Sequence, residues 1–146
     1  MLHLSTKGRY ATRIMVYLAG RKDKRPVPKQ EIAQAEGISI DYVEQILIKL
    51  RVAGLVKSHR GVNGGFSLAR PPEEITVTDV LAATEGGTEL APCLSAKCNR
   101  AAGCVTRPVW EKAARAIEQT FSAVTIGQLA AESASQPRNG NDGYEI

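Results

Sequence analysis

Residues from which enzyme active sites are usually built are scarce in this chain. Its 146 residues include two histidines, His3 and His59, and no arrangement of nucleophile and base can be recognised around them. No glycine fingerprint of a cofactor-binding loop is present either. The chain is therefore predicted not to be an enzyme.

Long apolar runs are also missing. The longest run near the start, Ile14–Ala19, falls far short of the roughly 18 to 20 residues that cross a bilayer. No signal peptide with a cleavage site is visible. We therefore expect a cytoplasmic protein without a membrane partner. Thiols stay reduced in that compartment, where clustered cysteines bind metals more often than they form disulfides.

Cysteine is limited to three residues, all within one stretch of twelve. Cys93, Cys98 and Cys104 are spaced C-x4-C-x5-C among Ala, Pro and Gly. Thiolates are soft ligands suited to zinc, Cu(I) and iron–sulfur clusters. Structural zinc usually takes four ligands and often a C-x2-4-C pair, and this spacing offers neither. The spacing alone leaves two interpretations open, a metal or iron–sulfur site and three ordinary thiols.

Charge is divided unevenly along the chain. Residues 1–70 hold 13 Lys and Arg against 5 Asp and Glu, a net +8, whereas residues 71–146 hold 6 against 10, a net −4. A basic front half indicates a module that binds a polyanion. A solvated basic face is the alternative.

The front half has the layout of a helix-turn-helix. A first helix is predicted from Ser5 or Thr6 to Gly20, a second from Pro28 to Gly37, and a third after Ser39. The third helix has apolar residues at i, i+3, i+4 and i+7 and polar residues on the opposite face. The apolar positions are Val43, Ile46, Leu47 and Leu50, and the polar ones are Asp41, Tyr42, Gln45 and Lys49.

A short hairpin is predicted directly after the third helix. Residues 55–60 and 66–69 read as strands on either side of a glycine-rich turn that contains Asn63-Gly64. Such a hairpin is a wing, and its Lys57 and Arg60 could reach phosphates or the minor groove. A plain surface hairpin is the alternative.

The second half contains three further predicted helices. Thr76 opens a fourth helix, Pro108 begins a long one, and Thr125 opens the last. The long helix has one apolar side and needs a partner, for which we expect its two-fold mate, since dimeric DNA readers match palindromic half-sites. Packing of this helix on its own domain is the alternative. The apolar side comprises Val109, Ala113, Ala116, Ile117, Phe121 and Val124.

The predicted fold is mainly α with a small β-hairpin wing, a winged helix-turn-helix followed by a long dimerisation helix. The expected units are a DNA-binding domain at 1–72, a connecting helix and cysteine loop at 73–107, dimerisation helices at 108–134 and a disordered tail at 135–146.

Four stretches carry a resemblance to a known family. They are Leu4–Ala11, Ile38–Gln45, Arg60–Phe66 and the cysteine loop followed by Trp110. Together they resemble the bacterial winged-helix regulators that include IscR, NsrR, RirA and CymR, the Rrf-two family, over about residues 2–134. The resemblance implies a homodimeric transcription factor that crosses its long helices and reads DNA with its third helix and wing.

Positions carried over from this resemblance suggest the base-contacting residues. They are Tyr42, Glu44 and Gln45 in the third helix and Arg60 in the wing; Asp41 stands where IscR has Ser, a difference that bears on the operator sequence. The full predicted DNA-binding set is Tyr42, Glu44, Gln45, Lys49, Lys57 and Arg60.

The resemblance also implies that the three cysteines bind an iron–sulfur cluster, 4Fe-4S or 2Fe-2S. IscR takes a fourth ligand from a His three residues beyond its last Cys, where this chain has Arg107. NsrR-like proteins take a carboxylate from the start of the first helix, and Arg9 stands at about that position here. The fourth position is then left to an external molecule or to one of Glu85, Glu89, Asn99 and His3.

The predicted function is an iron–sulfur-dependent, DNA-binding transcriptional regulator that senses cluster or iron status, nitric oxide or redox stress. Two alternatives remain. The chain could be a cluster-free regulator like CymR, which responds through a partner enzyme, or a zinc- or thiol-based regulator.

Overall fold

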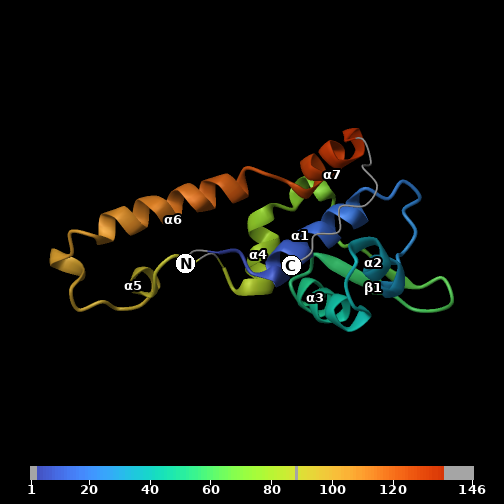
Figure 1. The fold of residues 1–146 in the computed structure, drawn as a ribbon, viewed down its shortest axis with the longest axis horizontal. Helices are drawn as coiled ribbons and strands as arrows, with labels where there is room; N and C mark the ends of the chain where they lie inside the picture. Colours follow the sequence, from blue (N-terminus) through green and yellow to red (C-terminus); the bar gives the residue numbers. More distant parts are fainter. Residues whose placement is uncertain (1–2, 88, 137–146) are drawn as a thin grey trace.

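A computed structural model describes residues 3–87 and 89–136, which form seven α-helices and one two-stranded sheet (Figure 1). The predicted fold class is confirmed. The helices are α1 (Thr6–Ala19), α2 (Lys29–Glu36), α3 (Ile40–Val52), α4 (Val77–Glu85), α5 (Pro92–Ser95), α6 (Arg107–Ser122) and α7 (Ile126–Ser135), and the strands are β1 (Val56–His59) and β2 (Gly65–Leu68). Short 3-10 turns lie at Pro72–Glu74 and Ala101–Gly103.

Helix ends follow the capping signals in the sequence. The Ser39 side chain accepts a hydrogen bond from the Tyr42 amide at the start of α3, and Gly37 ends α2 in the left-handed conformation. Thr76 and Thr125 both open capping boxes, at α4 and α7. The described part of α7 ends at Ser135, and most of the predicted tail lies outside the described residues.

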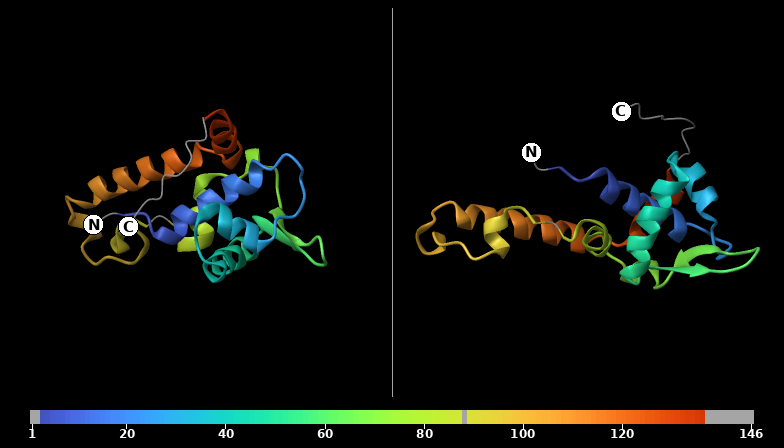
Figure 2. Two further views of the ribbon diagram at one scale, coloured as in Figure 1. Left: turned by 45° about the vertical axis from the view of Figure 1, so that its right-hand side comes forward. Right: turned by 90° about the horizontal axis from the view of Figure 1, so that it is seen from below.

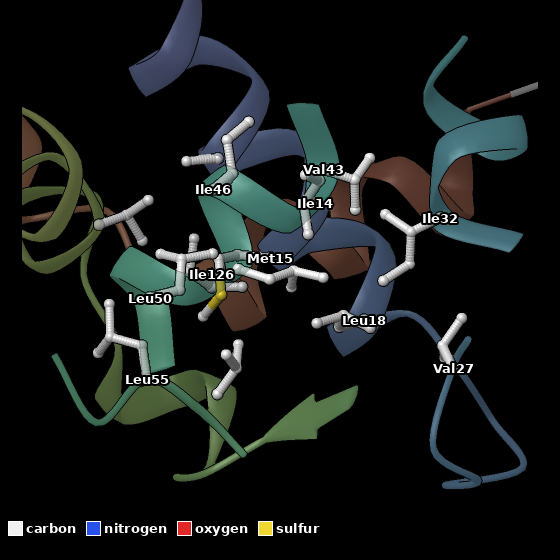
Figure 3. Packing of buried hydrophobic residues seen from close by; sticks show 14 of the residues in the cluster. Ile14, Met15, Leu18, Val27, Ile32, Val43, Ile46, Leu50, Leu55 and Ile126 are labelled. Atoms are coloured by element: carbon white, nitrogen blue, oxygen red, sulfur yellow. The ribbon is translucent and has the colours of Figure 1, made fainter. Parts of the chain in front are cut away.

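The core forms where α1, α3 and α7 meet. The predicted apolar stripe of α3 is fully buried, and Met15 of α1 and Leu50 of α3 lie beside Ile126, the first residue of α7 (Figure 3). A last helix thus completes the core of a domain built mainly from the first 70 residues. Truncating such a buried side chain to Ala typically costs about 2–5 kcal/mol, so α7 is part of the folding unit.

The wing is an antiparallel hairpin in which Val56 pairs with Leu68 and His59 with Gly65. Its turn is closed by a hydrogen bond from the Gly64 amide to the Gly61 carbonyl, 3.0 Å. Val62 and Asn63 are therefore the central turn residues, so Asn63-Gly64 is not the central pair that the hairpin signal suggested. Phe66 also exchanges two backbone hydrogen bonds of 2.8 Å with Val27, which anchors the wing to the segment before α2.

The chain leaves the core and returns to it at one place. The Val77 amide donates to the Val124 carbonyl at 3.0 Å, and the Ile126 amide donates to the Ile75 carbonyl at 2.8 Å. Between these points the chain runs outward through α5 and residues 96–106, and α6 leads from this far end back to the core (Figure 1). This far end and the wing lie at opposite ends of the molecule (Figures 1 and 2).

The projecting helix α6 has no buried residue. Val109 is 58% exposed and Trp110 42% exposed, and α6 packs mainly against α4 and α5. The inner part of α6 thus borders its own domain, with Ile117 and Phe121 in one pocket with Leu4 and Leu81, while Val109 and Trp110 of its outer part are exposed. In the part of the chain that the structure describes, no helix is long and apolar enough to span a membrane.

Gly65→Ala is expected to destabilise the protein by about 2 kcal/mol or more, because overpacking and a strained backbone add up. A methyl group at Gly65, whose φ is +150°, would lie 2.5 Å from the Val27 carbonyl. Urea unfolding followed by circular dichroism measures the change. Gly103→Ala is the control, since no atom lies within 4 Å of its added carbon. Equal midpoints for the two variants would contradict the prediction.

Candidate DNA interface and cysteine segment

The first predicted reading residue, Tyr42, is held by α1. Its ring stands edge-on to that of Tyr10, with centroids 6.1 Å apart and planes at 85°. The Arg13 guanidinium lies 5.2 Å from the centre of the Tyr10 ring and pairs with Glu36 at 2.7 Å. Burial raises the pKa of Glu36, and the charge of Arg13 acts in the opposite direction. The position of Tyr42 is thus set by packing before any DNA arrives.

Glu44 and Gln45 lie on the exposed side of α3. Lys29, the first residue of α2, donates to Glu44 Oε2 at 2.8 Å. A solvent-exposed pair of this kind is worth about 0–1 kcal/mol, so Glu44 can exchange Lys29 for another donor at little cost. Glutamate can accept from the cytosine amino group, and glutamine can bind adenine through two hydrogen bonds.

Lys49 has a protein partner instead of pointing freely into solvent. Its Nζ donates to the carbonyl oxygen of Thr84 at 3.0 Å, in the last turn of α4. That hydrogen bond joins α3 to the helix that leads toward the cysteines.

The wing presents its basic residues to solvent. Lys57 and Arg60 are exposed, and neither side chain makes a hydrogen bond or ion pair with another described residue. His59 shares a hydrogen bond of 2.8 Å with Ser67 across the hairpin. Uncommitted cations on a narrow hairpin suit contact with phosphates or with the minor groove.

The three cysteines lie at the far end of the molecule, in residues 93–104, which we name the cysteine segment. Cys93 belongs to α5, Cys98 follows it, and Cys104 comes directly after the second 3-10 turn. All three are half-buried free thiols. Among the described residues no three metal-ligating side chains gather around one point. Three thiolates are by their chemistry a suitable donor set for a zinc ion or an iron–sulfur cluster. Because they are not gathered around one point, the cysteine segment would have to close around such a group to bind it.

Arg107 ties the two ends of the cysteine segment together. Its Nη1 donates to the Cys93 carbonyl at 2.8 Å, and its Nε donates to Glu111 at 2.8 Å, one turn further along α6. A hydrogen bond with the Thr106 side chain lowers the pKa of the Cys104 thiol, and backbone hydrogen bonds of Thr106 and Arg107 act in the same direction. A thiolate is the form that binds metals.

The candidates for a fourth ligand divide between two pockets. His3, Glu85 and Glu89 line a pocket with Ile117 and Phe121 of α6. Asn99 lines another pocket with Cys104. Both carboxylates have hydroxyl partners, since Glu85 accepts from Ser5 at 2.7 Å and Glu89 accepts from Ser95. Asn99 is therefore the candidate that shares a pocket with one of the thiols.

Several supporting residues were not identified from the sequence. The one-turn spacing of Tyr10 and Arg13 places them on one face of α1, but nothing local indicates that this face meets Tyr42. Lys29 as the partner of Glu44 is equally a product of tertiary structure. The hydrogen bond from Arg107 to the Cys93 carbonyl could not be read from the sequence, where Arg107 was notable only as the replacement of a histidine.

The helix pair α2–α3, followed by a hairpin and an outward-projecting helix, defines the class as winged-helix DNA-binding regulators. The Rrf2 family model, described as an iron-dependent transcriptional regulator, matches residues 4–132. The chain belongs to this Rrf2 family, and the resemblance stated from its sequence is confirmed.

Relatives of this chain are named as regulators. It is 35% identical to protein rrf2 of Nitratidesulfovibrio vulgaris, over 94% of this chain and 93% of that protein. It is 36% identical to the transcriptional regulator IscR of Vibrio atlanticus, over 88% and 75%. Transcription regulation and DNA binding follow from the family, and the prediction that the chain is not an enzyme is confirmed by it.

Solved structures show the same fold. CymR, the global cysteine regulator of B. subtilis, superposes with a TM-score of 0.77 at 36% identity and covers 90% of this chain and 98% of its own. IscR of T. potens gives a TM-score of 0.77 at 37% identity, with 94% and 93% covered.

Arg60→Ala should weaken DNA binding and reduce its salt dependence if the wing contacts phosphate. The slope of log K against log salt should fall by about 0.9 for each lost phosphate contact. Fluorescence anisotropy with a DNA fragment selected by the wild-type protein, titrated at several KCl concentrations, measures it. Entry of Arg60 into the minor groove would instead relax a preference for A·T pairs. An unchanged affinity, slope and sequence preference would exclude Arg60 from the interface.

Proposed function

We propose that this protein is a homodimeric transcriptional regulator whose three cysteines bind an iron–sulfur cluster and make DNA affinity depend on it. The observation that carries the proposal is the position of the thiols. All three cysteines of the chain fall within the cysteine segment, which lies at the far end of α6, remote from the wing, and Arg107 holds the Cys93 carbonyl at the start of that segment. A family described as iron-dependent and IscR among the relatives support the same function.

The three cysteines and Arg107 have separate roles in this proposal. Cys93, Cys98 and Cys104 would hold the group, which supplies a centre sensitive to oxidants, to nitric oxide and to iron supply when bound. Arg107 would hold the Cys93 carbonyl against α6, so that only the intervening residues rearrange. A ligand shifts an equilibrium between two conformations only if it binds one of them more tightly. For a cluster to control DNA binding, the closed cysteine segment must therefore favour one orientation of the DNA-binding domains.

The second subunit is inferred from α6. Its apolar side includes Val109, Ala113 and Ala116, and the subunit itself leaves these side chains exposed or half-exposed. A two-fold mate would cover this side and place two α3–wing units on half-sites of a palindromic operator, about one helical turn or roughly 34 Å apart.

A cluster-free regulator is the second candidate. The structural match to CymR, titled a cysteine regulator, favours it, because that fold agrees as well as the IscR fold does. A structural zinc ion held by the same thiols belongs to this second class. Metal and sulfide content distinguishes these functions.

Native mass spectrometry of protein isolated without oxygen should show the mass of a 4Fe-4S or 2Fe-2S cluster on each subunit. Changing any one of Cys93, Cys98 and Cys104 to Ala should remove that mass and make DNA affinity independent of cluster loading. Bare protein that binds DNA would support the cluster-free function, and zinc would support the structural one. Unchanged cluster dependence in all three variants would refute the proposed function.

Ala116→Glu should convert the dimer to a monomer, because it places a charge in the middle of the apolar side of α6. A buried unpaired charge is costly, whereas the monomer leaves Ala116 exposed. Light scattering should show half the mass, and affinity for a palindromic site should fall at least tenfold. Gln119→Glu, which adds the same charge on another side of α6, should keep the dimer. A dimer in both variants would place the interface elsewhere.

A further inference from the structure

The reading helix α3 is joined to α4 by a charged hydrogen bond. Lys49 Nζ donates to the Thr84 carbonyl at 3.0 Å. Thr84 is itself buried, and its hydroxyl donates to the Val80 carbonyl. The last carbonyls of a helix lack intrahelical donors and lie at the negative end of the helix dipole, so a lysine there is favourable. Among the described residues, Lys49 is the donor to the Thr84 carbonyl, and Gly86 donates to the Ala82 carbonyl.

The C-terminal end of α4 is also a junction with other elements. Glu85, the next residue, accepts a hydrogen bond from Ser5 at the start of α1. Gly86 then ends α4 in the left-handed conformation, and the chain proceeds to α5, which carries Cys93. The helix α4 also contacts α6. A movement of the cysteine segment would reach the core through α4 or α6, and α4 packs against α3.

Lys49 differs from the basic residues of the wing in having a hydrogen-bond partner within the protein. Lys57 and Arg60 have no partner among the described residues, whereas the Lys49 ammonium group is committed to α4. Because this hydrogen bond uses one of the three donors of the Lys49 ammonium and fixes its position, any phosphate that Lys49 contacts must lie within reach of the end of α4. The two kinds of lysine should therefore respond differently to substitution.

We propose that Lys49 is a positioning residue, which makes the orientation of α3 follow the C-terminal end of α4 and so transmits the state of the cysteine segment to the reading helix. This assignment differs from the sequence prediction, which placed Lys49 in the DNA-binding set. The part of the proposal that concerns transmission rests on the function proposed above. The part that concerns the missing phosphate contact of Lys49 requires only that the protein binds DNA, as its family does.

The test uses the full chain as wild type, Lys49→Gln, Lys49→Arg and Lys57→Gln. Each protein is prepared as apo-protein and after anaerobic reconstitution with Fe2+ and sulfide. Affinity for a DNA fragment selected by the reconstituted wild type is measured by anisotropy at several KCl concentrations. Two quantities result, the salt slope and the ratio of affinities between the two states.

Lys49→Gln should keep the wild-type salt slope, and the ratio between states should fall at least fivefold, the lower end of typical coupling between sites. Lys49→Arg, which can still donate to the Thr84 carbonyl, should retain most of the ratio. Lys57→Gln is the matched control, since it should lower the slope by about 0.9 and leave the ratio unchanged.

Three results would overturn the proposal. A slope reduced by about 0.9 in Lys49→Gln, with an intact ratio, would make Lys49 a phosphate contact. An unchanged slope with an unchanged ratio would show that α4 does not act through Lys49. A wild-type ratio of one would refute cluster sensing, and transmission with it, and the slope would still show whether Lys49 touches phosphate.

Discussion

The architecture depends on the backbone pairing between Ile75–Val77 and Val124–Ile126. Two hydrogen bonds, of 2.8 and 3.0 Å, join these segments, and each segment also supplies the threonine that opens a helix. Ile126 enters the core directly beyond the pairing. The projecting part of the chain, formed by α5, residues 96–106 and α6, is therefore fixed to the DNA-binding domain at its base. The end that carries the cysteines is remote from that domain (Figure 2). Under the proposed function, a signal from that end would reach the DNA-binding domain through α4 and α6.

Most elements could be predicted because their signals are local. Ser39 and Gly37 mark helix ends, the i, i+3, i+4 pattern gave the buried face of α3, and Thr76 and Thr125 opened the expected helices. The hairpin was predicted, but its turn is centred one residue earlier than Asn63-Gly64, because Gly61 takes the positive φ that the connection needs. The short helix α5 was not predicted, since four residues in a loop have no periodicity to read.

The candidate site was predictable in composition but not in its contacts. The three cysteines and the exposed face of α3 could be identified from the sequence, because residue spacing alone defines both. Contacts such as Lys49 with Thr84, or Arg107 with the Cys93 carbonyl, join residues 35 and 14 positions apart and depend on how helices pack. Long-range contacts of this kind leave no local pattern. Lys49 was accordingly assigned to DNA from its exposed helical face, whereas the structure gives it a partner within the protein.

Charge on the reading surface is divided between two elements. On α3, Glu44 pairs with Lys29 and Lys49 with the end of α4, so these two charged groups of the reading helix already have protein partners. On the wing, Lys57 and Arg60 have none among the described residues. Phosphate contacts dominate affinity, and base contacts determine sequence preference. The wing is thus suited to supply affinity, and α3 to supply specificity. A change in the orientation of α3 would then alter which sequences are bound, while phosphate contacts of the wing, if formed as predicted, would keep the protein on DNA.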